Sequence, residues 1–127
     1  MSDSIGKVYD RLVIKNAMLV NGRGTPPYGP VDILIEEGKI NDIVNVDTIS
    51  LKRYNPKRPE GDHVIDAGGK YVIPGLVDMH LHINIDDEKC GPLGADYAYK
   101  LCLAHGITTI RTCGFNTDEA LLEHKRL

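Results

Sequence analysis

The sequence predicts an α/β protein in two parts: a small β-rich domain over residues 1–73, and two β/α units of a parallel sheet over residues 74–127. Three observations lead to this prediction. Short β-type runs alternate with glycine turns up to residue 73, Pro74 and Gly75 interrupt the pattern, and strand-like and helix-like segments alternate from there on. A strand, a helix and a second strand in succession indicate a parallel sheet, either doubly wound or closed into a barrel.

Four runs in the first part have the composition of β-strands: residues 12–14, 17–20, 31–35 and 40–46. The segment between the last two, residues 36–39, predicts a tight hairpin because Gly38 accepts a positive φ. In the third run the apolar residues at odd positions share one face, whereas Asp32 and Leu34 share the other. This alternation predicts a strand with one buried face.

Residues 47–62 are polar and contain prolines, which predicts a connection over the surface. Its basic residues are expected in a solvated loop and not in a binding patch; they are Lys52, Arg53, Lys57 and Arg58. The runs 63–66 and 70–73 then flank Ala67-Gly68-Gly69, a short glycine turn that predicts a second hairpin.

In the second part, residues 76–83 are predicted to form a strand, residues 95–105 a helix and residues 107–112 a second strand. Gly106 directly follows the helix and predicts its end, because glycine accepts the left-handed conformation. Asn116 and Glu119 have the spacing of a capping box, so a second helix is expected to begin there.

The chain has 127 residues, 42% of them hydrophobic, and a net charge of −3 from 15 basic and 18 acidic residues. This composition is typical of a soluble globular protein. The spread of charge predicts no nucleic-acid or membrane partner, and a small-molecule partner is expected. No signal peptide or membrane span is recognisable, so we expect a cytoplasmic protein with reduced, mostly structural cysteines, namely Cys90, Cys102 and Cys113.

The strand at residues 76–83 carries the most informative pattern. Because side chains two residues apart point to the same side of a strand, Asp78, His80 and His82 share one face. Inward polar groups in a parallel sheet need compensation, and a divalent metal bound by two imidazoles at about 2.0–2.1 Å supplies it. Asp78 is expected to accept a ring N–H and fix the tautomer. A bare His-x-His is more often a solvated strand end, since two ligands are too few for a metal site.

The flanking residues favour the metal site. The segment from Pro74 to His82 closely resembles the Pro-Gly-hydrophobic-hydrophobic-Asp-x-His-x-His entry to the barrel of the amidohydrolase superfamily. Residues 12–17, 33–40 and 64–70 look like the small β-sandwich-like domain that precedes that barrel. Residues 104–111 look like the end of its first helix and its second strand. The resemblance covers essentially the whole chain.

This resemblance implies the first two β/α units of an incomplete (β/α)8 TIM barrel. The complete barrel encloses one or two divalent ions, usually zinc, that activate water to attack an amide or another C–N bond. By matching position, His80 and His82 are the metal ligands, with Asp78 behind them. No catalytic residue is expected within this chain, because the family takes its remaining ligands and its base from later strands.

The other candidate residues are expected to be structural. His63, His105 and His124 fall in the predicted hairpin, at the bottom of the first helix and on the last helix. Cys113 follows the second strand, at the end of the barrel where the metal lies, but packing is the commoner role. Thr112 stands where many relatives of the imidazolonepropionase-like and prolidase-like branch have aspartate, so the branch stays open.

A closed barrel takes about 250 residues, and at least about 200, which residues 74–127 do not supply. We therefore expect a fragment, inactive alone, of a metal-dependent hydrolase of amide or cyclic amide C–N bonds. The alternative is a non-catalytic homologue that acts in assembly or scaffolding. Either protein could form a homo-oligomer, and the substrate would be set by loops such as residues 84–93 and 114–115.

Overall fold

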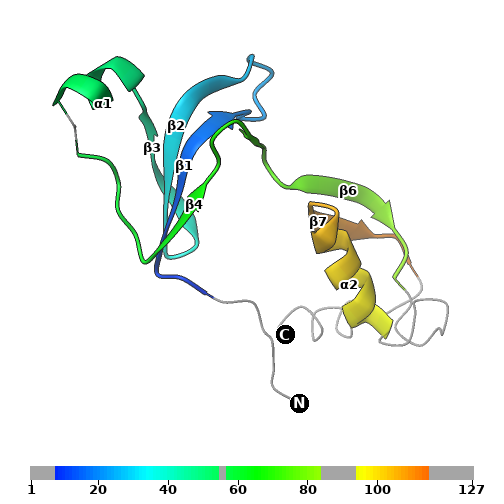
Figure 1. The fold of residues 1–127 in the computed structure, drawn as a ribbon. Helices are drawn as coiled ribbons and strands as arrows, with labels where there is room; N and C mark the ends of the chain where they lie inside the picture. Colours follow the sequence, from blue (N-terminus) through cyan, green and yellow to red (C-terminus); the bar gives the residue numbers. More distant parts are fainter. Residues whose placement is uncertain (1–7, 55–56, 84–93, 115–127) are drawn as a thin grey trace. The chain divides into compact units, whose positions relative to one another are not determined.

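The computed structural model describes residues 8–54, 57–83 and 94–114, and shows a mixed α/β structure made mostly of strands (Figure 1). The chain divides into two compact units, Met1–Pro74 and Gly75–Leu127, and each has its own sheet. The expected second helix, the loop at residues 84–93, Cys90 and His124 lie outside the described residues. Within the described ranges, no helix is long and apolar enough to cross a membrane.

The N-terminal unit contains a five-stranded sheet in the order β3-β2-β1-β4, with β5 also paired to β1. Its strands are β1 (Arg11–Leu19), β2 (Tyr28–Glu36), β3 (Lys39–Asn45), β4 (His63–Asp66) and β5 (Tyr71–Val72). The predicted hairpin between β2 and β3 is confirmed, because Glu37 and Gly38 both have positive φ, 51° and 73°. The described strands of this N-terminal unit form one sheet and not the two packed layers of a sandwich.

The runs predicted at residues 12–14 and 17–20 are a single strand, β1. Its register against β2 shifts between Ile14 and Ala17. Asn16 lies in this interval with a φ of 61°, a left-handed conformation that asparagine adopts more readily than most residues. Its backbone N–H donates to the Asp32 carboxylate at 3.1 Å. A local irregularity therefore interrupts the alternation without ending the strand.

The second predicted hairpin is wrong. Both β4 and β5 run parallel to β1, β4 beside its first half and β5 beside its last two residues. The glycine turn does form, because Lys70 N–H donates to the Ala67 carbonyl at 2.9 Å and Gly68 N–H donates to the Asp66 carboxylate at 3.0 Å. Asp66 also accepts a hydrogen bond from the Asn16 side chain at 2.9 Å. These bonds hold the turn next to the irregularity in β1. The chain leaves the turn in the direction in which it entered it, so β5, like β4, runs parallel to β1.

The polar connection over residues 47–62 contains a short helix that the sequence pattern did not predict, α1 (Thr48–Tyr54). Asp47 caps this helix: its carboxylate accepts the backbone N–H of Ile49 at 2.9 Å and the hydroxyl of Ser50. The hydrogen bond from Ser50, followed by those from the backbone, holds the pKa of Asp47 below its usual value. The cap was readable in the sequence, but no apolar periodicity accompanied it.

Four consecutive residues of β2, from Val31 to Leu34, are buried, so both faces of this strand are covered. The prediction of one buried face is therefore wrong. One side packs into the apolar core of the unit, which comprises Ala17, Leu19, Val31, Ile33 and Ala67. On the other side, Arg58 reaches back to the fully buried Asp32.

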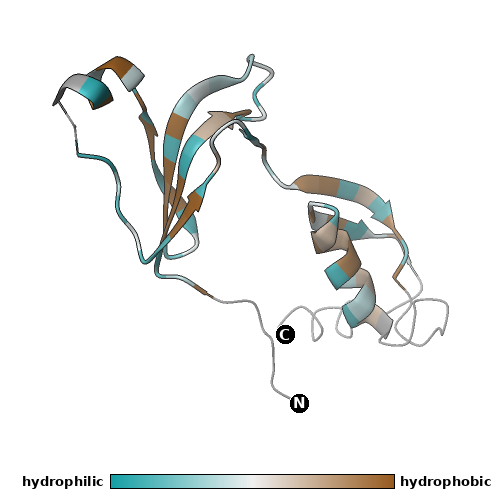
Figure 2. Cartoon of the chain, in the orientation of Figure 1, coloured by the Kyte–Doolittle hydropathy of each residue, from teal (hydrophilic) through white to brown (hydrophobic). Residues whose placement is uncertain are grey.

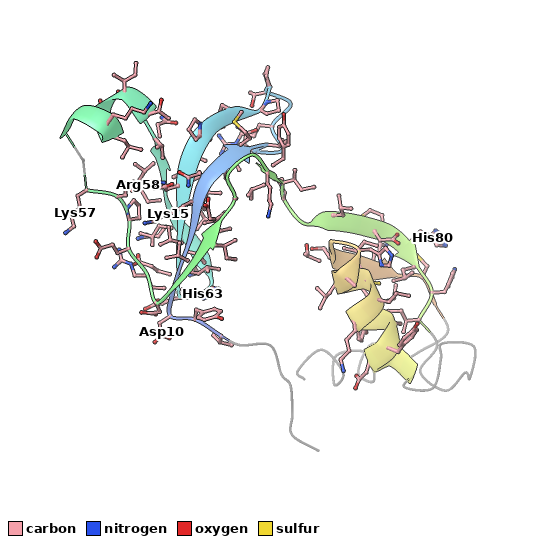
Figure 3. The ribbon with its side chains drawn as sticks, viewed as in Figure 1. Asp10, Lys15, Lys57, Arg58, His63 and His80 are labelled. Atoms are coloured by element: carbon pink, nitrogen blue, oxygen red, sulfur yellow. The ribbon has the colours of Figure 1, made fainter. Side chains whose placement is uncertain are left out.

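Arg58, labelled in Figure 3, holds Asp32 by several hydrogen bonds. Arg58 Nε donates to Asp32 Oδ2 at 2.7 Å, and Nη2 donates to Asp32 Oδ1 at 2.5 Å and to Asn16 Oδ1 at 2.7 Å. Burial, the largest influence, raises the pKa of Asp32, but hydrogen bonds from Arg58 and the Asn16 backbone outweigh it and keep the pKa below its ordinary value. Arg58 is therefore a structural partner of the sheet, and its assignment to a solvated loop is wrong.

The C-terminal unit contains β6 (Leu76–Leu81), α2 (Gly94–Ala104) and β7 (Ile107–Thr112), and its two strands pair in parallel. The predicted strand, helix and strand are thus confirmed, with bounds that agree closely. Gly106 follows α2 with a φ of 79°, as a left-handed helix stop requires.

The described residues of this unit form a small core. Ile83 and Ala95 are buried, and partly buried residues surround them: Leu81, Ala98, Tyr99 and Ile110. Apolar and polar residues alternate along β6 (Figure 2), but Val77 and Met79 are 56% and 59% exposed. Among the described residues, α2 packs against this face near the end of the strand, at Leu81 and Ile83.

Candidate metal centre

Two histidines meet at the carboxyl end of β6. The Nε2 atoms of His80 and His82 are 3.2 Å apart, and the two rings, with centroids 5.1 Å apart, are inclined by 68° (Figure 3 labels His80). Parallel side chains two residues apart on a flat strand would be separated by about 6.5–7 Å. The rings therefore lean toward each other, and their ε nitrogens lie within hydrogen-bonding distance of one another.

The separation of these two atoms can be compared with that of two ligands on one ion. Nitrogens bound to a tetrahedral zinc at about 2.0–2.1 Å are about 3.3 Å apart. The 3.2 Å between His80 and His82 fits this spacing. Both residues are exposed to solvent. The pair therefore satisfies the geometric requirement for two ligands of one divalent ion.

Two ligands do not complete a metal site. Within residues 8–54, 57–83 and 94–114, no group of three or more histidine, cysteine, aspartate or glutamate side chains is arranged to hold an ion. The Asp78 carboxylate accepts the backbone N–H of His80 at 3.0 Å. The expected hydrogen bond from an imidazole to Asp78 stays a prediction.

The pairing of β6 with β7 is irregular around this site. Leu76 pairs with Ile107 and Val77 with Thr109, so one extra residue lies on β7 at Thr108. Asp78 pairs with Ile110 and Leu81 with Thr112, so three steps along β6 match two steps along β7. The second shift returns the strands to the offset with which they began. Sequence periodicity gave no sign of either irregularity.

The remaining candidate residues have other surroundings. His63 stacks on Tyr9 in the N-terminal unit, with ring centroids 4.3 Å apart. Nδ1 of His105 lies 2.8 Å from the Leu101 carbonyl oxygen at the end of α2. Cys113 follows β7, and its sulfur lies 3.9 Å from the Met79 carbonyl oxygen. The structure thus brings together only His80 and His82 among the described histidines.

The N-terminal and C-terminal units together match proteins of known activity. The chain is 39% identical over 99 residues to L-hydantoinase of Paenarthrobacter aurescens and 40% identical over 119 residues to D-phenylhydantoinase of Escherichia coli (strain SE11). It is also 36% identical over 112 residues to dihydroorotase of Caldanaerobacter subterraneus subsp. tengcongensis. These matches cover 78%, 91% and 85% of the chain, respectively. This chain belongs to the amidohydrolase superfamily.

Solved structures of the superfamily agree with this assignment. The L-hydantoinase from Arthrobacter aurescens has a TM-score of 0.57 and 35% sequence identity, over 94% of this chain and 25% of that one. The N-acyl-D-glutamate deacylase from Bordetella bronchiseptica, complexed with zinc and a phosphonate inhibitor, has a TM-score of 0.53 and 26% identity over 82% of this chain and 18% of that one. No family model matches the chain.

This amidohydrolase chain spans only a part of its relatives. It covers 19% of the L-hydantoinase, 23% of the D-phenylhydantoinase and 22% of the dihydroorotase. Its similarity therefore concerns about one fifth of each enzyme.

Proposed function

We propose that the protein carrying this chain is a metal-dependent hydrolase that cleaves C–N bonds in small cyclic amides. The observation that carries the proposal is the 3.2 Å approach of the His80 and His82 ε nitrogens on β6. The kinship with hydantoinases and a dihydroorotase supports it, since their names refer to cyclic substrates that contain amide bonds.

In this proposal His80 and His82 hold a divalent cation through Nε2. Zinc is the proposed ion, because imidazole suits it and because a related deacylase is complexed with zinc. Such an ion lowers the pKa of its bound water to about 7 and polarises the carbonyl group that is attacked. The two histidines would hold the ion, and because both residues are exposed the site would be accessible to water.

We assign residues 74–127 to the first two β/α units of a (β/α)8 barrel and residues 1–73 to a small β domain before it. The parallel pairing of β6 with β7 and the intervening α2 support the barrel assignment. A site at the carboxyl end of a barrel strand is also where such enzymes place their chemistry. Because only two candidate ligands are present among the described residues, this chain alone is expected to be inactive.

The test uses the full-length protein and the variants His80→Ala and His82→Ala. Hydrolysis of hydantoin and of dihydroorotate is measured together with zinc content. Each variant is expected to lose zinc and to lose at least about 100-fold in rate, since removing a ligand exceeds the 10- to 100-fold effect typical of outer-shell changes. His105→Ala is the matched control because this ring contacts a helix carbonyl and not the pair.

A non-catalytic homologue that acts in assembly is the rival. It predicts no hydrolysis and no bound zinc in the unmodified protein, and no effect of either substitution. Zinc and hydrolysis that persist unchanged in both histidine variants would refute the proposed site.

A further inference from the structure

The pairing irregularity at the end of β6 coincides with the histidine pair. Between Asp78 and Leu81, β6 contains one residue more than the facing segment of β7. An inserted residue of this kind bends its strand, increases the local twist and leaves a backbone group without its partner in the ladder. His80 is one of the two residues inside the interval.

The side chain of Asp78 supplies a partner at this point. Its Oδ1 atom accepts the backbone N–H of His80 at 3.0 Å, a contact between residues two apart in the chain. Short carboxylates commonly make such local bonds to the backbone and so stabilise a conformation that regular structure does not. The bond therefore fixes the bent segment that carries the first histidine.

The bend is also necessary for the pairing that follows it. The extra residue on β7 at Thr108 offsets the strands, and the extra residue on β6 removes the offset. Beyond it Leu81 pairs with Thr112, and Cys113 N–H donates to the Leu81 carbonyl at 3.0 Å. A straightened β6 would shift these pairs by one residue and turn its last side chains to the other face.

We infer that Asp78 is a positioning residue, whose carboxylate holds the bend that turns the His80 ring toward His82. This inference rests on the proposed metal site. It assigns Asp78 a bond to the backbone as an oxygen acceptor, so the negative charge of the carboxylate is not required. The amide oxygen of an asparagine at position 78 should accept the same hydrogen bond, whereas the methyl group of an alanine cannot.

The experiment compares Asp78→Asn, Asp78→Ala and Asp42→Ala in the full-length protein after removal of its metal. Asp42 is the matched control, because its carboxylate also accepts a backbone N–H, that of Ile43 at 2.8 Å, beside a register shift in β3. Zinc affinity is measured by titration, the ligand geometry by the visible absorption of Co²⁺, and the backbone bond by hydrogen exchange of the segment containing His80.

Asp78→Ala is expected to bind zinc about 10- to 100-fold more weakly, to alter the Co²⁺ spectrum and to speed exchange around His80. Asp78→Asn and Asp42→Ala should stay within about threefold of the unmodified protein, a shift in binding free energy of about 0.6 kcal/mol by the relation between affinity and energy. If Asp78→Ala does not fold, Asp78→Asn still decides: retained affinity and spectrum support the inference.

Two outcomes would overturn the positioning role. Asp78→Asn could lose as much affinity as Asp78→Ala, which would make the charge the active property, or Asp78→Ala could behave as the unmodified protein does. The proposed function fails in a different way, when His80→Ala retains full zinc affinity. Loss of zinc in His80→Ala without any loss in Asp78→Ala leaves the proposed function intact and removes only the role of Asp78.

Discussion

The two units of this chain use polar residues in opposite ways. In the N-terminal sheet, Asp32 is fully buried and its carboxylate accepts hydrogen bonds from Arg58 and Asn16, so these polar groups satisfy one another. In the C-terminal unit, His80 and His82 are exposed and direct their ε nitrogens to a common point. The comparison teaches that a closed polar cluster supports a fold, whereas one with open positions can accept a ligand.

The apolar residues differ in the same way. Among the described residues, the core cluster of the N-terminal sheet contains five buried residues, four of them on β1 and β2, whereas that of the C-terminal unit contains two. Leu76, Val77 and Met79 on β6 are about half exposed or more. Within the described residues, apolar side chains are therefore more fully buried in the N-terminal sheet than in the C-terminal unit.

The largest expected effect follows from removing Arg58 from its hydrogen bonds with Asp32 and Asn16. Arg58→Ala would leave the Asp32 charge buried without its partner, which typically costs about 3–5 kcal/mol. Lys57→Ala is the control, because the Lys57 side chain is exposed. Substitutions at exposed positions usually change the free energy of unfolding by less than about 0.5 kcal/mol. Hydrogen exchange of β1 and β2 in the full-length protein measures both. Equal stabilities of the two variants would contradict the role of the pair.

A smaller loss is expected at the start of the C-terminal unit. A Cβ atom at Gly75 would lie 2.0 Å from Thr108 Oγ1 and 2.5 Å from its Cγ2, and a β-branched side chain has few ways to move aside. Gly75→Ala should therefore destabilise the pairing of β6 and β7 by about 1–3 kcal/mol.

The steric origin of this loss can be tested by a second change. Adding Thr108→Gly removes all three atoms that the new Cβ would meet, so the double variant should recover more stability than additivity allows. Thermal unfolding of the four proteins in the cycle measures the coupling. Strictly additive effects would show that the clash is not the cause.

A helix cap gives the next effect in size. Asp47→Ala removes the acceptor for the Ile49 N–H and should destabilise α1, whereas Asp47→Asn keeps an oxygen there and should be nearly neutral. Denaturant unfolding distinguishes the two variants. An equal loss in both would assign the effect to the charge of Asp47 and not to its hydrogen bonds.

The smallest effect expected near neutral pH is the pH dependence of stability that Asp32 contributes. Burial raises the pKa of Asp32, but the hydrogen bonds from Arg58 and Asn16 outweigh it, so the folded-state pKa lies below the unfolded value of 3.8. A depressed pKa stabilises the fold above the unfolded value, and this contribution is lost as pH falls through the folded one. The contribution of Asp32 to the stability of the sheet should therefore be constant from pH 8 to 5 and should decline in more acidic solution. A decline that begins near pH 6 would contradict the assignment.

Local patterns predicted the parts of the fold that depend on neighbours in the chain. The turn at Glu37 and Gly38, the helix stop at Gly106 and the convergence of His80 with His82 all follow from spacing within a few residues. The sequence did not reveal that β4 and β5 flank β1 in parallel, because a glycine turn of the same composition can reverse a chain or merely displace it. Which strands pair depends on contacts throughout the sheet, between segments that are distant in the sequence.

Long-range and irregular features were missed for related reasons. Arg58 and Asp32 are 26 residues apart, and nothing in a basic, proline-containing segment marks one arginine as buried. The register shift between Asp78 and Leu81 leaves the alternation of residue types unchanged, so a pattern of period two cannot show it. The sequence did not reveal that the Asp78 carboxylate accepts the backbone N–H of His80, and its expected bond to an imidazole ring stays a prediction.

The central claim is that His80 and His82 bind one ion together. A crystal structure of the full-length protein with zinc, with the ion located by its anomalous scattering, tests it most directly. The account predicts an anomalous peak about 2.0–2.1 Å from Nε2 of both residues. A fully loaded protein whose zinc lies beyond bonding distance of either ring would contradict it.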